Sequence, residues 1–466
     1  MESIAIVGCG AAGVALMANM ARLGWGRTGR ILLVDPRLPG SGIAFDHDEE
    51  YLLCNTSVGV NSIFPDDPDH HLRWLRSDLV HGTRWGIDRS AVTPDSYVPR
   101  GLFLAYLSDQ FRRAMDDCAA RGILVDHLPD SAVRITPEDG RVVVATDAGD
   151  RFPVDRAVVC TGLQTSDETA RRCRESTGAL WPAYQTSRNL DRLARAGRIA
   201  VLGMGQSAID SARLVREHNS GGEIVMVSRS ARFPAVRSEM VERPSEILTA
   251  TAILEPSALD RPGDVLRWRR LVREDLYSQG GAPNLFPPRH SDPIRQLRAD
   301  LEHTLTGSRA WQRIDRNAVT VANAVWPAVP SNRRMPLQRW YTRHVRRYVS
   351  AVPEAVAREL LTATAQGKLR CARAVGEPVF GARGVSIDSD RGPILADVAI
   401  DATGLTAVSR HSRTLTPTAT RPGDGSAIHY LGPASGAALA IPNYFNAAAR
   451  QAVALASSLT AQVTRN

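Results

Sequence analysis

The sequence predicts an α/β protein with two Rossmann-like dinucleotide-binding domains, the second inserted in the first and carrying a helical insertion. Two glycine-rich turns about 195 residues apart support this prediction: Gly8-Cys9-Gly10-Ala11-Ala12-Gly13 and Gly203-Met204-Gly205-Gln206-Ser207-Ala208. Each turn follows an apolar, strand-like run and opens a helix-like run, the setting in which a pyrophosphate meets a tight turn and a helix N-terminus. Two such turns in one chain indicate two bound dinucleotides and electron transfer between them.

Length and composition suit a protein of several domains, each with its own core. The chain has 466 residues, of which 43% are hydrophobic and 23% are charged, as in an ordinary globular protein. The apolar stretch 4–23 lacks a basic leader, and the first glycine turn accounts for its glycines better than a secretion signal does. No apolar run reaches the ~18 residues of a membrane helix, so we expect a cytoplasmic protein that does not bind membranes.

The net charge of +8 raises the question of nucleic-acid binding. Lys368 is the only lysine, so 56 of the 57 basic residues are arginines, and they are spread along the chain. Such a skew is typical of codon usage in a GC-rich genome, and the chain has no motif of the usual nucleic-acid-binding modules. We therefore expect no nucleic-acid partner.

Six cysteines and eleven histidines provide no obvious redox or metal motif. No Cys-x-x-Cys pair is present, which argues against a thiol-disulfide reductase. His70 and His71 are adjacent and do not share a helix face. We expect reduced, structural cysteines and no metal ligand.

After the first turn, residues 11–23 are predicted to form a helix and residues 30–35 a strand. Asp35 lies 22 residues beyond Gly13, close to the spacing at which an acid meets a ribose hydroxyl. This spacing predicts FAD or NAD at the first turn. The alternative is that Asp35 only ends a strand.

Residues 102–121 follow as a predicted helix, and 123–159 as short strands separated by turns. The last of these strands ends in Cys160-Thr161-Gly162, and a later strand ends in the similar Asp401-Ala402-Thr403-Gly404. We expect both strands to end near the same cofactor. The first domain would then comprise residues 1–180 and 370–466, and the NADPH-binding domain residues 181–369.

The second glycine turn is followed by a predicted strand over 223–227 that ends in Ser228-Arg229 rather than in an acid. An arginine here can pair with an adenosine 2′-phosphate in a charge-assisted hydrogen bond worth roughly 1.5–3 kcal/mol. The pattern favours NADPH over NADH. The alternative is a solvated surface arginine.

Residues from about 256 to 368 are predicted to form a basic, mainly helical insertion, which is interrupted at Pro287-Pro288, Pro327 and Pro330. Its spacing of arginines and aromatics indicates amphipathic helices that pack one apolar face. Residues 441–464 are predicted to form a closing helix with Asn443 as its N-cap. The N-terminus of that helix faces the edge of the flavin, or the alanine-rich helix only packs against the rest of the protein.

The second glycine turn resembles the NADPH-site turn of flavin-dependent monooxygenases, especially the N-hydroxylating ones. Leu52-Leu53-Cys54-Asn55-Thr56 and Tyr97-Val98-Pro99-Arg100-Gly101 are similar to the related bacterial FAD/NAD(P)-binding group. The resemblance spans most of the chain, to about Leu405. It departs at residues 346–352 and 432–446, where substrate contacts are plausible, so it does not define a substrate.

The resemblance implies roles for individual residues. Those implied to hold FAD are Gly8, Gly10, Gly13 and Asp35, with Arg100 near the flavin or its pyrophosphate. Those implied to hold NADPH are Gln206, Ser207 and Arg229. Asn55 would lie near the flavin and the nicotinamide, as a catalytic amide or as a structural turn residue. The other candidate cofactor residues are Ala11, Ala12, Thr161, Gly162, Gly203, Gly205, Ala208, Ser228, Asp401 and Gly404.

The resemblance implies an NADPH-dependent FAD monooxygenase that uses O2 to oxygenate a small molecule. An amine or amino-acid nitrogen is the favoured target, and carbon hydroxylation stays open. One alternative is a flavin dehydrogenase or oxidase that inserts no oxygen. Another is a biosynthetic protein whose flavin is not redox-active. The sequence leaves self-association open.

Overall fold

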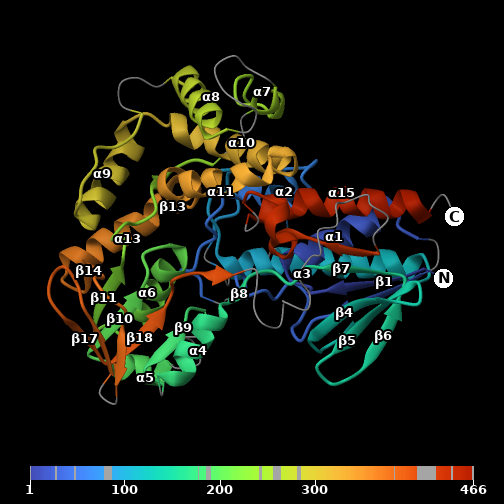
Figure 1. Ribbon diagram of the computed structural model, residues 1–466, viewed down its shortest axis with the longest axis horizontal. Helices are drawn as coiled ribbons and strands as arrows, with labels where there is room; N and C mark the ends of the chain where they lie inside the picture. Colours follow the sequence, from blue (N-terminus) through green and yellow to red (C-terminus); the bar gives the residue numbers. More distant parts are fainter. Residues whose placement is uncertain are drawn as a thin grey trace. The chain divides into compact units, whose positions relative to one another are not determined.

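The computed structural model describes residues 2–26, 29–46, 49–77, 85, 87–176, 178–184, 190–240, 244–255, 264–280, 285–381, 384–406, 427–441 and 444–463. The chain divides into two compact units (Figure 1). Unit 1 comprises Met1–Gln164 and Thr406–Asn466, and unit 2 comprises Thr165–Leu405. The boundaries expected from the sequence were 180/181 and 369/370. The structure places both boundaries differently, because segments 165–180 and 370–405 contribute a helix and several strands to unit 2.

Unit 1 is built on a five-stranded parallel sheet of order β20-β7-β1-β2-β3. Its strands are β1 (Glu2–Val7), β2 (Gly29–Val34), β3 (Ile123–Leu128), β7 (Arg156–Val159) and β20 (Ile428–Tyr430). Successive residues of the central strands enter two different cores: Ile4 and Ile6 of β1 face one, Ala5 and Val7 the other. Burial on both faces explains why these strands read as continuous apolar runs.

Helices cover one face of this sheet and strands cover the other (Figure 1). The helices are α1 (Ala11–Leu23), α3 (Arg100–Ala120) and α15 (Phe445–Val463), and α1 packs against both of the others. The second face holds an antiparallel sheet of β4 (Ala132–Glu138), β5 (Arg141–Thr146) and β6 (Arg151–Val154). Short helices η1 (Val58–Val60), α2 (His70–Arg76) and η5 (Gly432–Ala438) complete the unit. The predicted N-cap Asn443 lies outside the described residues.

Unit 2 repeats this plan with a parallel sheet of order β14-β11-β10-β18-β9. Its strands are β9 (Leu180–Pro182), β10 (Arg198–Leu202), β11 (Glu223–Ser228), β14 (Leu369–Arg373) and β18 (Val398–Asp401). The associated helices are α4 (Asp167–Glu175), α5 (Leu190–Arg195), α6 (Gln206–His218) and α13 (Glu354–Ala365). An antiparallel sheet of β15 (Val379–Gly381), β16 (Gly384–Ile387) and β17 (Ile394–Ala396) packs on one face. The chain changes units at β8 (Gln164–Thr165) and β19 (Leu405–Thr406).

The two strands that end in Thr-Gly, expected to end near the same cofactor, belong to the sheets of different units. β7 pairs with β1 in unit 1, whereas β18 pairs with β10 in unit 2. Each strand therefore lies beside the glycine turn of its own unit. The two strands are equivalent in topology, since each lies between the strand that leads into its glycine turn and an edge strand, and each follows a three-stranded antiparallel insert.

The region from about residue 256 to 368, predicted to be mainly helical, is mostly helical where the structure describes it, and one further helix precedes it. The elements are α7 (Ala250–Leu254), α8 (Val265–Ser278), α9 (Pro293–Thr306), α10 (Ala310–Val325), η3 (Trp326–Ala328), α11 (Ser331–Trp340), the π-helix η4 (Tyr341–Val345) and α12 (Arg346–Val349). The side chains of Asp264 and Asp292 cap α8 and α9. β12 (Val236–Arg237) and β13 (Val352–Pro353) pair at the end of this region. Pro330 precedes α11, as expected of a helix start, but Pro336 lies inside that helix.

Candidate dinucleotide-binding sites

In the first glycine turn, protein atoms lie close to Gly8 and Gly13, and there is free space at the middle glycine, Gly10. A Cβ on Gly8, whose φ is +90°, would lie 2.7 Å from the Cys160 carbonyl oxygen, and a Cβ on Gly13 would lie 2.4 Å from the Gly8 oxygen. The nearest atom to a Cβ on Gly10 is the Cα of Gly42, at 3.6 Å. Gly8 and Gly13 are therefore needed by the turn itself, whereas Gly10 leaves space beside the N-terminus of α1 for a pyrophosphate.

Asp35 reaches back to this turn from the end of β2. Its Oδ2 accepts a hydrogen bond from the Cys9 amide at 2.7 Å, and its Oδ1 accepts one from the Arg37 amide at 2.9 Å. These bonds hold the carboxylate beside the open turn, where an acid meets a nucleotide ribose. The sequence spacing had predicted this position, and only the structure shows that the carboxylate also braces the turn.

The structure brings together the two motifs around Asn55 and Arg100. The backbone amide of Cys54 donates to the Val98 oxygen, and that of Arg100 donates to the Leu52 oxygen, each at 2.8 Å. The Arg100 side chain is 3% exposed and donates to the carbonyls of Leu53 and Ala44. Its guanidinium thus ties two loop segments together.

Asn55 lies within the paired segment and is half-buried. Its side chain makes no hydrogen bond with any residue that the structure describes. The neighbouring Thr56 hydroxyl donates to Asn61 Oδ1 at 2.6 Å, and Asn61 Nδ2 donates to the Thr56 carbonyl. Asn61 therefore shapes the turn, a role that sequence reasoning missed, and leaves the Asn55 amide available.

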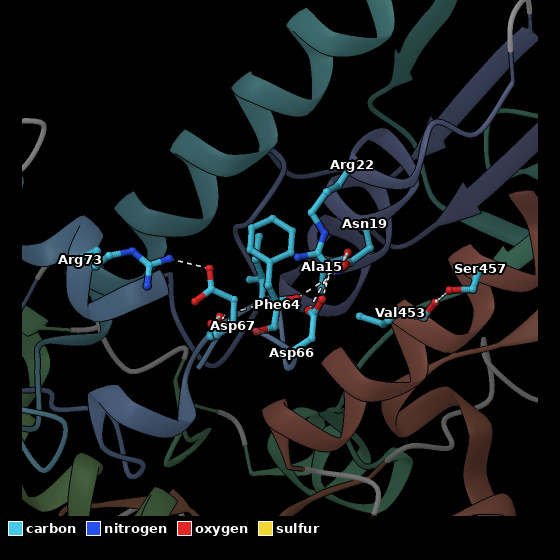
Figure 2. Close-up of polar contacts among 11 residues, drawn as sticks. Ala15, Asn19, Arg22, Phe64, Asp66, Asp67, Arg73, Val453 and Ser457 are labelled. Carbon is cyan, nitrogen blue, oxygen red and sulfur yellow. Dashed lines mark hydrogen bonds and ion pairs between the residues drawn. The ribbon is translucent and has the colours of Figure 1, made fainter. Parts of the chain in front are cut away.

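The loop after Asn61 is fastened to α1 (Figure 2). The Asn19 side chain, fully buried in α1, donates to the carbonyls of Ala15 and Ile63 at 2.7 and 3.0 Å. Arg22, one turn further along α1, makes two hydrogen bonds to Asp66 and lies over the Phe64 ring. The helix that opens at the glycine turn thus also positions the segment that follows Asn55.

The second glycine turn has the same geometry in unit 2. A Cβ on Gly203, whose φ is +123°, would lie 2.5 Å from the Ala402 oxygen, whereas a Cβ on Gly205 would meet nothing within 4 Å. Ala208 takes the third position and is fully buried. The open second glycine beside the N-terminus of the 13-residue helix α6 fits a second pyrophosphate.

Three candidate residues near this turn differ in whether their polar groups already interact with the protein. Gln206 Nε2 donates to the carbonyls of Ser350 and Ala351, at 2.6 and 3.1 Å, so its amide nitrogen is already engaged by protein. The Ser228 hydroxyl accepts from the Ala231 amide. Arg229 is exposed and has no acid partner among the described residues. Arg229 is thus the candidate here whose charge is available to a ligand.

A small cavity of unit 2 lies at the ends of β10 and β18. It is lined by Thr165, Thr169, Pro182, Ala183, Ser207, Asp401, Ala402, Gly404 and Leu405. The Asp401 side chain is fully buried and accepts hydrogen bonds from the hydroxyls of Thr169 and Thr403, at 3.1 and 2.7 Å. Arg172 adds an ion pair at 3.3 Å. Asp401 therefore positions the Thr403 turn, and no sequence signal identified Thr169 or Arg172 as its partners.

All six cysteines are free thiols. Burial, the charge of Asp35 and the nearby Cys160 raise the pKa of Cys9 well above its ordinary value, and burial also raises the pKa of Cys160. These thiols are protonated at neutral pH and are poor nucleophiles. In the described part of the chain, no group of three or more His, Cys, Asp or Glu residues is placed to hold a metal ion. No described helix is both long and apolar enough to cross a membrane.

Two parallel sheets, each with a glycine turn, define the class of fold: that of proteins with two dinucleotide-binding units. Residues 5–164 match the model of a family described as FAD-NAD(P)-binding. A comparison of the sequence with curated proteins gave no match.

Solved structures of N-hydroxylating and related monooxygenases share this fold over 99% of both chains. They include ornithine hydroxylase from Pseudomonas aeruginosa in its reduced form, with 12% identity and a TM-score of 0.58. L-lysine 6-monooxygenase from Pseudomonas syringae has 14% identity and a TM-score of 0.57. The ornithine N-hydroxylase of Kutzneria sp. 744, a complex with reduced FAD, NADP+ and L-ornithine, has 14% identity and a TM-score of 0.56. The fold predicted from the two glycine turns is confirmed.

Proposed function

We propose that this protein is an FAD-dependent, NADPH-using monooxygenase that oxygenates a small molecule, with an amine or amino-acid nitrogen as the favoured target. The observation that carries the proposal is the pair of glycine turns, one per unit, each with an open second glycine at a helix N-terminus. The strands beside them end differently, in Asp35 and in Arg229. The likeness in fold to ornithine and lysine monooxygenases supports the reaction class.

Unit 1 is proposed to hold FAD. Gly10 and the first amides of α1 would meet the pyrophosphate, and Asp35 would accept a hydrogen bond from the adenosine ribose. A 2′-phosphate at this ribose would meet the Asp35 carboxylate, and like-charge repulsion disfavours it. Unit 1 is therefore suited to FAD rather than to NADPH.

Unit 2 is proposed to hold NADPH. Gly205 and the N-terminus of α6 would meet its pyrophosphate, and Arg229 its 2′-phosphate through a charge-assisted hydrogen bond. One such bond contributes roughly 1.5–3 kcal/mol, about a tenfold preference or more over NADH. We expect Arg229→Gln to raise the KM for NADPH about tenfold and to leave the KM for NADH nearly unchanged.

When bound, FAD would accept a hydride from NADPH and use O2 to supply one oxygen atom to the substrate. The chain's own residues would bind, orient and keep water away. The Asn55 amide, which makes no hydrogen bond with the described residues, is suited to donate one to a ligand. Because the cofactors supply the chemistry, no catalytic triad or carboxylate pair is required.

The proposal is tested by adding NADPH to the FAD-loaded protein without oxygen and recording the flavin absorbance. Loss of the oxidised-flavin absorbance, followed by transfer of one 18O atom from labelled O2 to an added amine, is the expected result. Bleaching followed only by hydrogen peroxide, with every amine tested, would indicate an oxidase. No bleaching with either nicotinamide would overturn the redox assignment and indicate a structural flavin.

A further inference from the structure

Four arginine side chains and His344 gather on unit 2, outside the glycine turn. Arg232 follows β11, Arg269 lies on α8, Arg289 lies just before α9, and Arg343 and His344 lie on the π-helix η4. All five are exposed. None of the four guanidiniums has an acid partner among the described residues.

This lack of partners is not a general property of the region, because neighbouring arginines on the same segments are paired. Arg270 of α8 pairs with Glu274, and Arg347, which follows η4, pairs with Asp300 of α9. Acids are therefore available nearby, and yet the four arginines around His344 pair with none that the structure describes.

A common apolar core holds the segments that carry these arginines. Ala235, Leu276 of α8 and Ala351 belong to one buried cluster, against which Leu285 and Tyr348 pack. The rings of Phe286 and Tyr348 are 5.1 Å apart, and the Ala235 amide donates to the Arg347 carbonyl at 2.8 Å. The four segments thus meet in a fixed arrangement under the basic surface.

The same contacts place this surface at the carboxyl end of the unit 2 sheet. Gln206, the first residue of α6, donates to the Ser350 carbonyl. The Val352 amide donates to the Ala235 carbonyl, seven residues beyond the end of β11. Segment 346–352 is therefore anchored next to the glycine turn, at the carboxyl end of a parallel sheet, where ligands bind.

No acid that the structure describes is paired with these four arginines. Partial burial and the charges of the four arginines together lower the pKa of His344. A surface of one sign raises the local concentration of its counter-ion and speeds association. Guanidinium groups match phosphate oxygens in geometry, and π-helical turns such as η4 occur frequently at functional sites.

We propose that His344, Arg232, Arg269, Arg289 and Arg343 form a phosphate-binding surface that attracts and holds the doubly phosphorylated adenosine end of NADPH. The inference rests on the NADPH use proposed above and extends it. A phosphate monoester carries about −1.5 to −2 charges at neutral pH, so Arg229 alone leaves part of that charge uncompensated. The surface supplies the remaining positive charge for the phosphate and adds to the preference for NADPH over NADH.

The test is calorimetric binding of adenosine 2′,5′-bisphosphate to the FAD-loaded protein and to the double variant Arg269→Gln/Arg343→Gln. We expect the double variant to bind tenfold or more weakly, with a shallower dependence on salt, and to bind AMP almost as the parent does. The matched control is Arg195→Gln, an exposed arginine of α5 in the same unit, which should change neither value.

Several outcomes would overturn the inference. They are unchanged binding in the double variant, no binding of the bisphosphate to the parent protein, and equal affinity for AMP, inorganic phosphate and the bisphosphate.

Failure of this inference is distinguishable from failure of the proposed function. If NADPH reduces the flavin equally well in parent and double variant, the surface is wrong and the function stands. If NADPH does not reduce the flavin but the bisphosphate binds in an arginine-dependent way, the function is wrong and the surface stands.

Discussion

Two kinds of glycine residue serve the same turn for different physical reasons. Gly203 has a positive φ and a carbonyl oxygen where its Cβ would be, so the fold needs it. Gly205 has an ordinary φ of −84° and free space at its Cβ position, so the fold does not require glycine there. Gly8 and Gly10 repeat this division in unit 1. Substitution can therefore separate stability from binding at neighbouring positions.

We expect Gly203→Ala to destabilise the protein by about 2–4 kcal/mol, because the new methyl would combine a left-handed backbone with a clash against the Ala402 oxygen. The measurement is chemical denaturation followed by circular dichroism. The control is Gly140→Ala, which has φ +76° but nothing within 4 Å of its Cβ and should cost only about 1 kcal/mol. Equal costs for the two variants would contradict this explanation.

His71 makes stability depend on pH. Burial among aromatic rings lowers its pKa to about 3, whereas the unfolded chain has a histidine pKa near 6.5. Below about pH 6.5 the unfolded state binds a proton that the folded state does not, so stability falls as pH falls toward 3. The contribution of this residue approaches about 1.4 kcal/mol per pH unit in that window.

We expect His71→Phe to reduce this loss of stability between pH 6.5 and pH 4.5, since phenylalanine fills a similar volume and cannot be protonated. Urea denaturation at several pH values measures it. His127→Phe is the control for replacing an imidazole that is exposed and lies outside the aromatic cluster. An identical slope in parent protein and His71→Phe would show that His71 is not the group responsible.

Among the elements, α4 is attached to β18 through the buried carboxylate of Asp401. Thr169 and Arg172, three residues apart on α4, both donate to it. In unit 1 the equivalent strand end, Val159, is apolar. The polar attachment of the Thr403 turn is thus specific to unit 2.

We expect Arg172→Met to lower the free energy of unfolding by about 1–3 kcal/mol, because it leaves a buried carboxylate without its cation. The neighbouring Arg171 is an internal control, since its partners Glu168 and Glu175 are exposed on the same helix. Arg171→Met should have little effect in the same denaturation experiment. A larger loss from Arg171→Met than from Arg172→Met would contradict the assigned role of Asp401.

At the scale of the whole molecule, each unit has its own sheet, glycine turn and antiparallel insert. If the two cofactors are divided between the units as proposed, binding of each should be lost separately. The second glycine of each turn is the position at which to test this, because alanine there fits the protein but obstructs a pyrophosphate.

We expect Gly10→Ala to reduce FAD retention at least tenfold while binding of adenosine 2′,5′-bisphosphate persists. Gly205→Ala should retain FAD and require at least tenfold more NADPH for flavin reduction. Flavin absorbance after gel filtration and NADPH titration measure the two effects, with circular dichroism as the check on folding. Loss of both ligands in both variants would argue against one cofactor per unit.

The sequence by itself determined the local parts of this protein. The helix over residues 11–23, the strands around both turns and the place of Asp35 were predictable, because apolar periodicity, the conformational needs of glycine and acid spacing act over short stretches of chain. The helical character of the region from about residue 256 to 368 was predictable for the same reason.

Only the tertiary structure decided which distant segments meet. It placed β18 beside β10 rather than in the first sheet, supplied Asp401 with partners more than 200 residues away, and joined Gln206 to Ser350. It also gathered the arginines around His344 from four separate segments. Such contacts depend on which faces pack together over long loops, and neither residue spacing nor composition carries that information.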